Sequence, residues 1–389
     1  MTDSTAEGPS HHLYVHVPFC RLLCAYCDFV TVGGRAADIP RYVDGLVAEI
    51  GLRPADGELR TISFGGGTPS LLAPEQVARV IDAAKDRWSR FALAEVSLEA
   101  NPSRRERPDW AGLRDAGVTR ISLGVQSLLD ADLVALARGH DAAEAREAFA
   151  RARDAGFESV SIDLIYGIPG QGIADWADGL EAAIVLGPDH ISCYALQLIL
   201  APDEWAAVPR SGALRWRRRM ADLQDDAVAA EQYRLAESML ADAGYRHYEL
   251  SSWARPGHES RHNGAYWARR PYTGVGAGAH SFDGLAERSW NVGDLDAYLA
   301  AVEAGRRPLG GKDPLDEPAR AFEAMALGLR LIDGLQRRSF ADEFGSDPLA
   351  RWKRVASDFI EVTPERLRLT PDGRLFASEA LLPFLPATG

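Results

Sequence analysis

The chain has 389 residues, of which 46% are hydrophobic and 25% charged, a composition typical of a soluble globular protein with one large domain or a large and a small one. Its formal net charge of −13 argues against nonspecific nucleic-acid binding, which needs Lys and Arg to neutralise phosphates. The sequence contains no long apolar run, and its first residues lack the basic and then apolar segments of a signal peptide. We therefore expect a cytoplasmic protein that is not an integral membrane protein.

Strand-like and helix-like patterns alternate through the first half of the chain. We expect strands at residues 13–19, 61–66, 95–102, 120–127, 159–170 and 190–198, and helices at 40–53, 73–88, 130–156 (one helix or two) and 175–187. This alternation indicates βα units around a parallel sheet. Six such units, rather than eight, predict an α/β fold with a partial (βα)6 barrel. Its functional residues should gather at the carboxyl ends of the strands.

The pattern changes after about residue 200. A long helix is expected at 221–244, followed by segments rich in aromatic residues, histidine and glycine. We divide the chain into a flexible tail (1–12), a core (13–305) whose later part (about 200–305) is a cap, and a C-terminal domain (306–389) that begins with a linker at 306–319. That domain should be small and winged-helix-like, with a hairpin turning at Asp372-Gly373 and then a helix.

Three of the four cysteines lie within the segment HVPFCRLLCAYCDF. Cys20, Cys24 and Cys27 have the spacing C-x3-C-x2-C and follow the first predicted strand. In a reducing compartment such a group favours metal binding or catalysis over disulfides. One interpretation is a zinc site completed by His16. The other is a [4Fe-4S] cluster with three cysteine ligands, which leaves one iron open for a further ligand.

Polar residues occur near the ends of several apolar strands. Glu99, Gln126 and Asp163 belong to the third, fourth and fifth predicted strands. A carboxylate in an apolar strand must be paired or hydrogen-bonded. One interpretation is an ion pair with Arg120 or Arg138, and the other is hydrogen bonding to a polar ligand.

The cysteine spacing, with an aromatic residue before the third cysteine, resembles the signature of radical S-adenosylmethionine (SAM) enzymes. In that family SAM binds the open iron, and an electron from the cluster cleaves SAM to methionine and a 5′-deoxyadenosyl radical. The segment GGGTPS, which could also be a tight turn, is similar to a glycine-rich segment that contacts SAM in the family. The resemblance implies that Cys20, Cys24 and Cys27 bind the cluster. It also implies a SAM site that includes Tyr14, Tyr26, Gly66, Gly67, Thr68, Glu99, Gln126, Arg138 and Asp163.

Further segments occur in a fixed order over nearly the whole chain: YVHVPFCRLLCAYCDF, GGGTPS, EANP, GVQS, LARGH, IDLIYGIPGQ, HNGAYW and GVGAGAHS. This order resembles the coproporphyrinogen-oxidase-like group of radical SAM proteins. One branch, the oxygen-independent coproporphyrinogen III oxidases, has a further cysteine after the cluster motif and a longer N-terminal arm. This chain has Asp28 and Phe29 at that point and 19 residues before Cys20, so it is more similar to the other branch, the haem chaperones. Coproporphyrinogen III oxidation stays the alternative function.

The segment HNGAYW is similar to a haem-associated motif of the chaperone branch. The resemblance implies that His262 or Tyr266 binds haem iron and that aromatic rings cover the porphyrin; the alternative is that these residues hold the cap against the barrel. It further implies apo-haemoprotein clients, including membrane-bound respiratory enzymes, and an electron donor such as flavodoxin or ferredoxin. Ile199 replaces a glutamate of the family pattern, and residues 203–220 also depart from it, so substrate or haem handling could differ.

Overall fold

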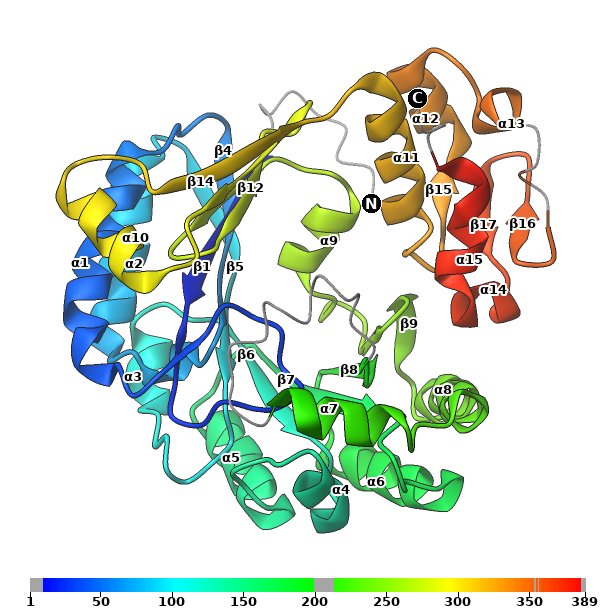
Figure 1. The fold of residues 1–389 in the computed structure, drawn as a ribbon, viewed down its shortest axis with the longest axis horizontal. Helices are drawn as coiled ribbons and strands as arrows, with labels where there is room; N and C mark the ends of the chain where they lie inside the picture. Colours follow the sequence, from blue (N-terminus) through cyan, green and yellow to red (C-terminus); the bar gives the residue numbers. More distant parts are fainter. Residues whose placement is uncertain (1–9, 199–212, 353–354, 356, 386–389) are drawn as a thin grey trace.

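The computed structural model describes residues 10–198, 213–352, 355 and 357–385. Ile199 and residues 203–212, where the sequence departs from the family pattern, lie outside the described residues. The described part contains a large mixed sheet that curves around the short helix α9 (Arg261–Trp267), and a separate small sheet in the C-terminal region (Figure 1).

The centre of the large sheet is parallel, as predicted from the alternation of strands and helices. Its strands run in the order β11-β1-β4-β5-β6-β7-β8, and the sheet order ends at β14 and β9, so the barrel is open. Most side chains of these strands are buried, as expected where both faces of a parallel sheet are covered. The six strands of the βα units are β1 (Ser10–Val17), β4 (Glu58–Gly66), β5 (Phe91–Ala100), β6 (Arg120–Gln126), β7 (Ser159–Tyr166) and β8 (His190–Ala195).

Helices cover the outside of the parallel strands (Figure 1). In α1 (Ile39–Leu52), Tyr42, Val43, Leu46 and Ile50 bury one face against the sheet, at helical spacing. The predicted helix at 130–156 is two helices, and the long helix expected at 221–244 begins at residue 226 after a separate short helix. The other helices are α2 (Pro74–Arg87), α3 (Trp110–Asp115), α4 (Asp130–Ala135), α5 (Ala142–Asp154), α6 (Ile173–Leu186), α7 (Ala213–Ala221) and α8 (Asp226–Asp242).

Antiparallel strands extend the sheet at both edges, and the structure corrects two of the expected boundaries. Residues 309–314, expected in a linker, form an edge strand that is hydrogen-bonded to its neighbour. Residues 10–12, expected in a flexible tail, begin β1 and pair with β4. The added elements are β9 (Arg246–Glu249), β10 (Ser252–Ala254), β11 (Tyr272–Val275), β12 (His280–Phe282), β13 (Glu287–Asn291), β14 (Leu309–Pro314) and, between the last two, α10 (Leu295–Glu303).

The C-terminal region has its own small core, which includes Met325, Leu329, Leu367 and Phe384. A three-stranded antiparallel sheet in the order β15-β17-β16 packs with short helices, as a winged-helix-like domain requires. The elements are α11 (Glu317–Gly328), β15 (Leu335–Gln336), α12 (Arg337–Phe344), α13 (Pro348–Arg351), β16 (Ile360–Val362), β17 (Arg366–Leu369), α14 (Pro371–Leu375) and α15 (Ala377–Leu381).

The predicted hairpin turn at Asp372-Gly373 is wrong. The hairpin is formed by β16 and β17 and turns at residues 363–365, while Asp372 and Gly373 lie in α14. The Thr370 hydroxyl accepts a hydrogen bond from Gly373 N at 3.0 Å, and Pro371 suits the first helical position, so the local sequence starts a helix.

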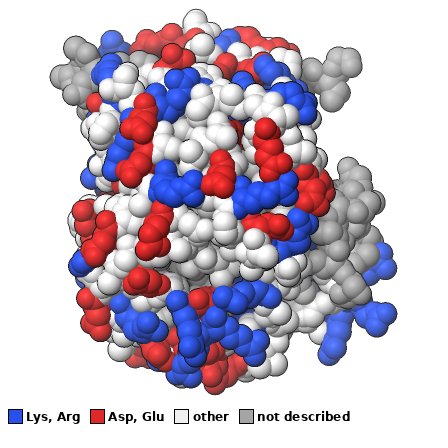
Figure 2. Space-filling view, turned by 90° about the vertical axis from the view of Figure 1, so that its left-hand side faces the viewer, with Lys and Arg blue, Asp and Glu red and all other residues white. Residues whose placement is uncertain are grey.

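Among the described residues, no helix is both long and apolar enough to cross a membrane. Figure 2 shows acidic and basic side chains interspersed on the side of the molecule where α1, α2 and α10 lie. Ion pairs between these helices include Arg41 with Glu303 and Arg79 with Asp44.

Candidate cofactor site

The cysteine loop lies at the carboxyl end of β1. A short parallel pair, β2 (Phe19–Cys20) and β3 (Val32–Gly33), joins the two ends of the loop. Cys20, Cys24 and Cys27 are half-buried, and Cys27 N donates to the carbonyl of Cys24 at 3.3 Å. The loop therefore occupies the edge of the sheet at which parallel barrels carry their functional residues.

Two arginines hold this loop. Arg138, which follows α4, donates from Nη1 to Cys24 Sγ and to the Tyr26 hydroxyl, both at 3.1 Å. Arg217, a buried residue of α7, donates from Nε to the carbonyl of Ala25 at 2.9 Å. The sequence indicated Arg138 as a SAM contact or as an ion-pair partner of a strand carboxylate, and it did not distinguish Arg217 from the other arginines of the segment RWRRRM. The one available signal, a run of basic residues, does not tell which of them is buried.

The donors around the loop fit an anionic cluster. Arg138 Nε and Arg217 Nη1 are buried and lack a hydrogen-bond partner among the described residues. Buried donors normally have an acceptor, and cationic neighbours favour the thiolate form in which cysteine binds metal. Three cysteines beside two buried guanidinium groups therefore suit a [4Fe-4S] cluster, whose ligands are thiolates.

The zinc alternative required His16 as a fourth ligand. Its Nε2 donates to the carbonyl of Val30 at 2.7 Å, so Nδ1 accepts from the Tyr14 hydroxyl at 3.2 Å. Both ring nitrogens are thus in use, and the structure favours the cluster over a zinc site with this histidine. Within the described part of the chain no three Cys, His, Asp or Glu side chains converge on a single metal ion, and in a cubane cluster each cysteine binds a separate iron.

The GGGTPS segment packs directly on the cysteine loop. Gly66 has a φ of +109°, and a Cβ at this position would lie 2.5 Å from the His16 ring. A Cβ on Gly67 would lie 2.7 Å from the backbone of Pro18. Both glycines are needed for contact with the loop, whether or not SAM also binds here. The buried Thr68 donates from its hydroxyl to Cys20 Sγ at 3.7 Å.

The carboxylates of Glu99 and Asp163 lie near the ends of β5 and β7. Glu99 is surrounded by protein yet exposes part of its surface, so it faces a space inside the barrel. Among the described residues its hydrogen-bond donor is Gly66 N, at 3.1 Å, while Asp163 accepts from the Ser122 hydroxyl at 3.1 Å. Burial, together with the charge of Asp163, raises the pKa of Glu99 to about 7, and burial also raises the pKa of Asp163. Such groups are suited to binding a polar ligand in a water-poor site.

The proposed ionic partners of these carboxylates bind elsewhere. Arg120 donates to the carbonyl of His258 at 2.8 Å, and Arg138 binds the cysteine loop. Gln126 ends β6 with a φ of +67°, which is unusual for a residue with a side chain and occurs often at functional sites.

The histidine of HNGAYW, His262, is fully buried in α9. Its backbone N donates to Glu95 at 3.1 Å, its Nδ1 bonds with the Thr61 hydroxyl at 2.7 Å, and its Nε2 bonds with the Tyr266 hydroxyl at 2.8 Å. Burial lowers the pKa of His262 to about 3, so the ring is neutral. No ring nitrogen is left for haem iron in this arrangement, which fits the alternative that the motif holds the cap on the barrel.

A cavity of about 480 Å³ opens beside the cysteine loop. Aromatic rings from four regions line it: Tyr14 on β1, Phe29 after the third cysteine, Tyr266 and Trp267 on α9, and Tyr272 and Phe282 on β11 and β12. This size and lining are typical of sites for cofactor-sized apolar ligands, which occupy roughly 300–1,000 Å³.

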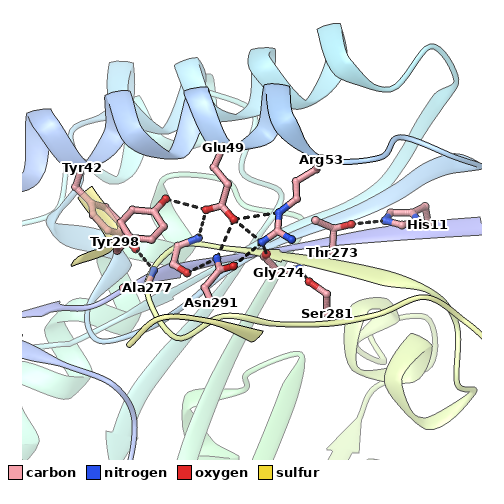
Figure 3. A network of polar contacts seen from close by, with 11 residues as sticks. His11, Tyr42, Glu49, Arg53, Thr273, Gly274, Ala277, Ser281, Asn291 and Tyr298 are labelled. Atoms are coloured by element: carbon pink, nitrogen blue, oxygen red, sulfur yellow. Dashed lines mark hydrogen bonds and ion pairs between the residues drawn. The ribbon is translucent and has the colours of Figure 1, made fainter. Parts of the chain in front are cut away.

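A buried polar network, which the sequence analysis missed, fixes the neighbouring glycine-rich loop (Figure 3). The Glu49 carboxylate accepts hydrogen bonds from Asn291 Nδ2, the Tyr298 hydroxyl and Gly276 N, each at 2.8 Å, and pairs with Arg53. A glutamate on the buried face of α1, with an arginine four residues later just after the end of the helix, is the signal that could have revealed it.

An open parallel barrel with a three-cysteine loop after its first strand defines a radical SAM protein, and the comparisons agree. The model of the radical SAM superfamily matches residues 14–183, and the model of the HemN C-terminal domain matches residues 315–376. The solved structure of coproporphyrinogen III oxidase (HemN) from Escherichia coli superposes with a TM-score of 0.80, covering 97% of this chain and 90% of that one, at 24% identity, which establishes a shared fold.

Two curated relatives identify the family of the chain more closely. Heme chaperone HemW of Mycobacterium tuberculosis is 37% identical over 95% of this chain and 93% of its own length. Heme chaperone HemW of Bacillus subtilis is 31% identical over 96% of this chain and 98% of its own length. The chain belongs to the HemW family.

Proposed function

We propose that this protein is a haem chaperone that binds a [4Fe-4S] cluster, SAM and haem, and delivers haem to apo-haemoproteins, including membrane-bound respiratory enzymes. The observation that carries the proposal is the similarity, over almost the full length, to proteins named heme chaperone HemW. The arrangement of the site supports it, because Asp28 and Phe29 of the cysteine loop line the aromatic cavity, and Gly66 of the GGGTPS segment donates to Glu99.

In this proposal Cys20, Cys24 and Cys27 hold the cluster, and Arg138 offsets part of its negative charge. Arg217 holds the loop through the Ala25 carbonyl and an ion pair with Asp28. When bound, the cluster supplies an electron and an open iron to SAM. The electron comes from a flavodoxin- or ferredoxin-like donor in the cytoplasm.

The residues at the strand ends then bind and orient SAM. Glu99 and Asp163 accept hydrogen bonds from its amine and hydroxyl groups. Gln126 supplies an amide at the end of β6, and Gly66 and Gly67 let the backbone approach closely.

The cluster is tested by anaerobic reconstitution with iron and sulfide. We expect about four irons per chain and loss of the iron in Cys24→Ala. Cys193→Ala is the matched control, because Cys193 is buried in β8 and should not affect iron loading. Stoichiometric zinc in place of iron and sulfide would contradict this part of the proposal.

The function is tested by two assays on one anaerobic preparation. Titration with haem should reach one haem per chain. Incubation with coproporphyrinogen III, SAM and a reductant should give no protoporphyrinogen IX. Repeated turnover of coproporphyrinogen III, without stoichiometric haem binding, would contradict the chaperone and support the oxidase.

A further inference from the structure

We propose that His280 binds the haem iron in the cavity beside the cysteine loop, and that Tyr266 and Trp267 of α9 form part of the cavity wall. This inference rests on the proposed haem-binding function and assigns the iron ligand within it. Four features of the structure support it.

The first feature is the hydrogen bonding of the His280 ring, which is exposed at the wall of the cavity. Its Nδ1 lies 3.1 Å from the carbonyl oxygen of Gly278. A carbonyl only accepts, so Nδ1 carries a proton, and in the neutral ring Nε2 carries the lone pair. Nε2 has no hydrogen-bond partner in the part of the chain that the structure describes. Histidines that bind metals commonly donate their other N–H to a backbone carbonyl in this way.

The second feature is the contrast with the other histidines nearby. His16 also lines the cavity, but it uses Nε2 on the carbonyl of Val30 and Nδ1 on a tyrosine hydroxyl. His262 is buried and uses both ring nitrogens on Thr61 and Tyr266. Of these three histidines, His280 alone has a nitrogen lone pair without a protein partner.

The third feature is the rigid support of the segment before His280. Gly276 N donates to Glu49 at 2.8 Å, and Ala277 N donates to the Tyr42 hydroxyl at 2.9 Å. On the far side the His280 ring stacks on Trp290, with centroids 5.9 Å apart and planes 28° apart. A ligand held from both sides meets the requirement for a pre-organised metal site.

The fourth feature is a cavity wall suited to a porphyrin. The side chain of Phe29 is 64% exposed at this wall, and an apolar ring on that surface would be covered by a flat apolar ligand. Arg269 and Arg288 also line the cavity. Arg269 donates to Glu323 and Glu343, and Arg288 donates to Glu323 and the Tyr272 hydroxyl. Each guanidinium has five N–H groups, so both keep donors for the haem propionates.

The test compares His280→Ala with His262→Ala as the matched control. Ferric haem is titrated into each anaerobic protein, and the Soret band and the electron paramagnetic resonance spectrum are recorded. Iron and sulfide content confirms that each variant retains the cluster and is folded. For His280→Ala we expect a shifted Soret band. We also expect the haem affinity to fall by at least about tenfold, because losing even a residue that hydrogen-bonds to a metal ligand lowers metal affinity about tenfold. Added imidazole should restore the wild-type spectrum.

His262→Ala should keep the axial-ligand spectrum of the wild type, even if its affinity falls because α9 is less well held. An unchanged spectrum and affinity in His280→Ala, with normal haem binding by the wild type, would overturn the ligand assignment alone. A change of ligand spectrum in His262→Ala that imidazole reverses would also overturn it. Absence of haem binding by the wild type would overturn the proposed function and this inference with it.

Discussion

Two glutamates on neighbouring parts of the fold have opposite surroundings. Glu49 is completely buried between α1 and the glycine-rich loop, and it accepts hydrogen bonds from Arg53, Asn291, Tyr298 and Gly276. Glu99 lies inside the barrel, where its described donor is one backbone N–H and its surface faces open space.

The difference shows how to separate structural from ligand-binding polar groups in this protein. A carboxylate whose acceptor capacity is filled by the protein stabilises the fold, because removing it leaves its partners buried and unsatisfied. A carboxylate with spare capacity beside a cavity can bind a ligand instead. The same criterion separates His262, which has both nitrogens bonded, from His280.

The largest expected effect concerns Glu49, the structural carboxylate of this comparison. Glu49→Gln should lower the free energy of unfolding by about 3–5 kcal/mol, because the buried Arg53 loses its charge partner. Urea unfolding of the cluster-free protein measures this change. SAM affinity of the folded fraction should stay the same, and a loss of stability below about 1 kcal/mol would break the comparison.

The next largest effect concerns the carboxylates that we expect to bind SAM. Glu99→Gln and Asp163→Asn should each weaken SAM binding by about 1–3 kcal/mol, because a polar group of the ligand loses its partner. Calorimetry on the reconstituted protein measures the affinity, and iron content should not change. Unchanged affinity in both variants would mean that these carboxylates are structural after all.

A smaller effect follows from the pKa of Glu99, which is raised from 4.5 to about 7. SAM affinity should increase between pH 6 and pH 8 as the carboxylate ionises, and Glu99→Gln should flatten this dependence. The raised pKa also means that protonated Glu99 favours the folded state, a contribution that is complete below pH 4.5 and is lost as the pH rises through 7. Glu99→Gln should therefore be more stable relative to the wild type at pH 8 than at pH 5 in thermal unfolding. The opposite order would exclude the raised pKa.

The smallest effect concerns an exposed ion pair on the side of the molecule that Figure 2 shows. Arg41→Ala should change the free energy of unfolding by no more than about 1 kcal/mol, since its pair with Glu303 is solvent-exposed. The change is measured by urea unfolding, and Glu49→Gln measured in parallel is the reference. A loss of stability as large as that of Glu49→Gln would show that the burial of an ion pair does not determine how much it stabilises the fold.

The sequence predicts most of the parallel barrel because its strands are apolar runs between amphipathic helices. It fails at β14, LGGKDP, because this exposed edge strand has glycine, charge and proline instead of an alternating apolar pattern. It also misplaces the hairpin of the C-terminal domain, since an Asp-Gly pair favours a turn in isolation while Thr370 and Pro371 start a helix there.

At the site, too, the sequence reveals local motifs but not long-range contacts. The cysteines, GGGTPS and the strand-end carboxylates are recognisable from local motifs. The roles of Arg217 and Glu49 depend on partners 192 and 242 residues away, Ala25 and Asn291, which no local pattern specifies. HNGAYW lies on α9, which lines the cavity, but a motif does not tell that both ring nitrogens of His262 are already bonded.

The central claim, that this protein carries haem to other proteins, is tested most directly by transfer. Haem-loaded protein is mixed with an apo-haemoprotein of the respiratory membrane, and the client's haem spectrum is followed over time. The account predicts a rate that rises with client concentration and exceeds the rate at which a passive haem scavenger removes haem. Equal rates with client and scavenger would mean simple dissociation and would contradict the account.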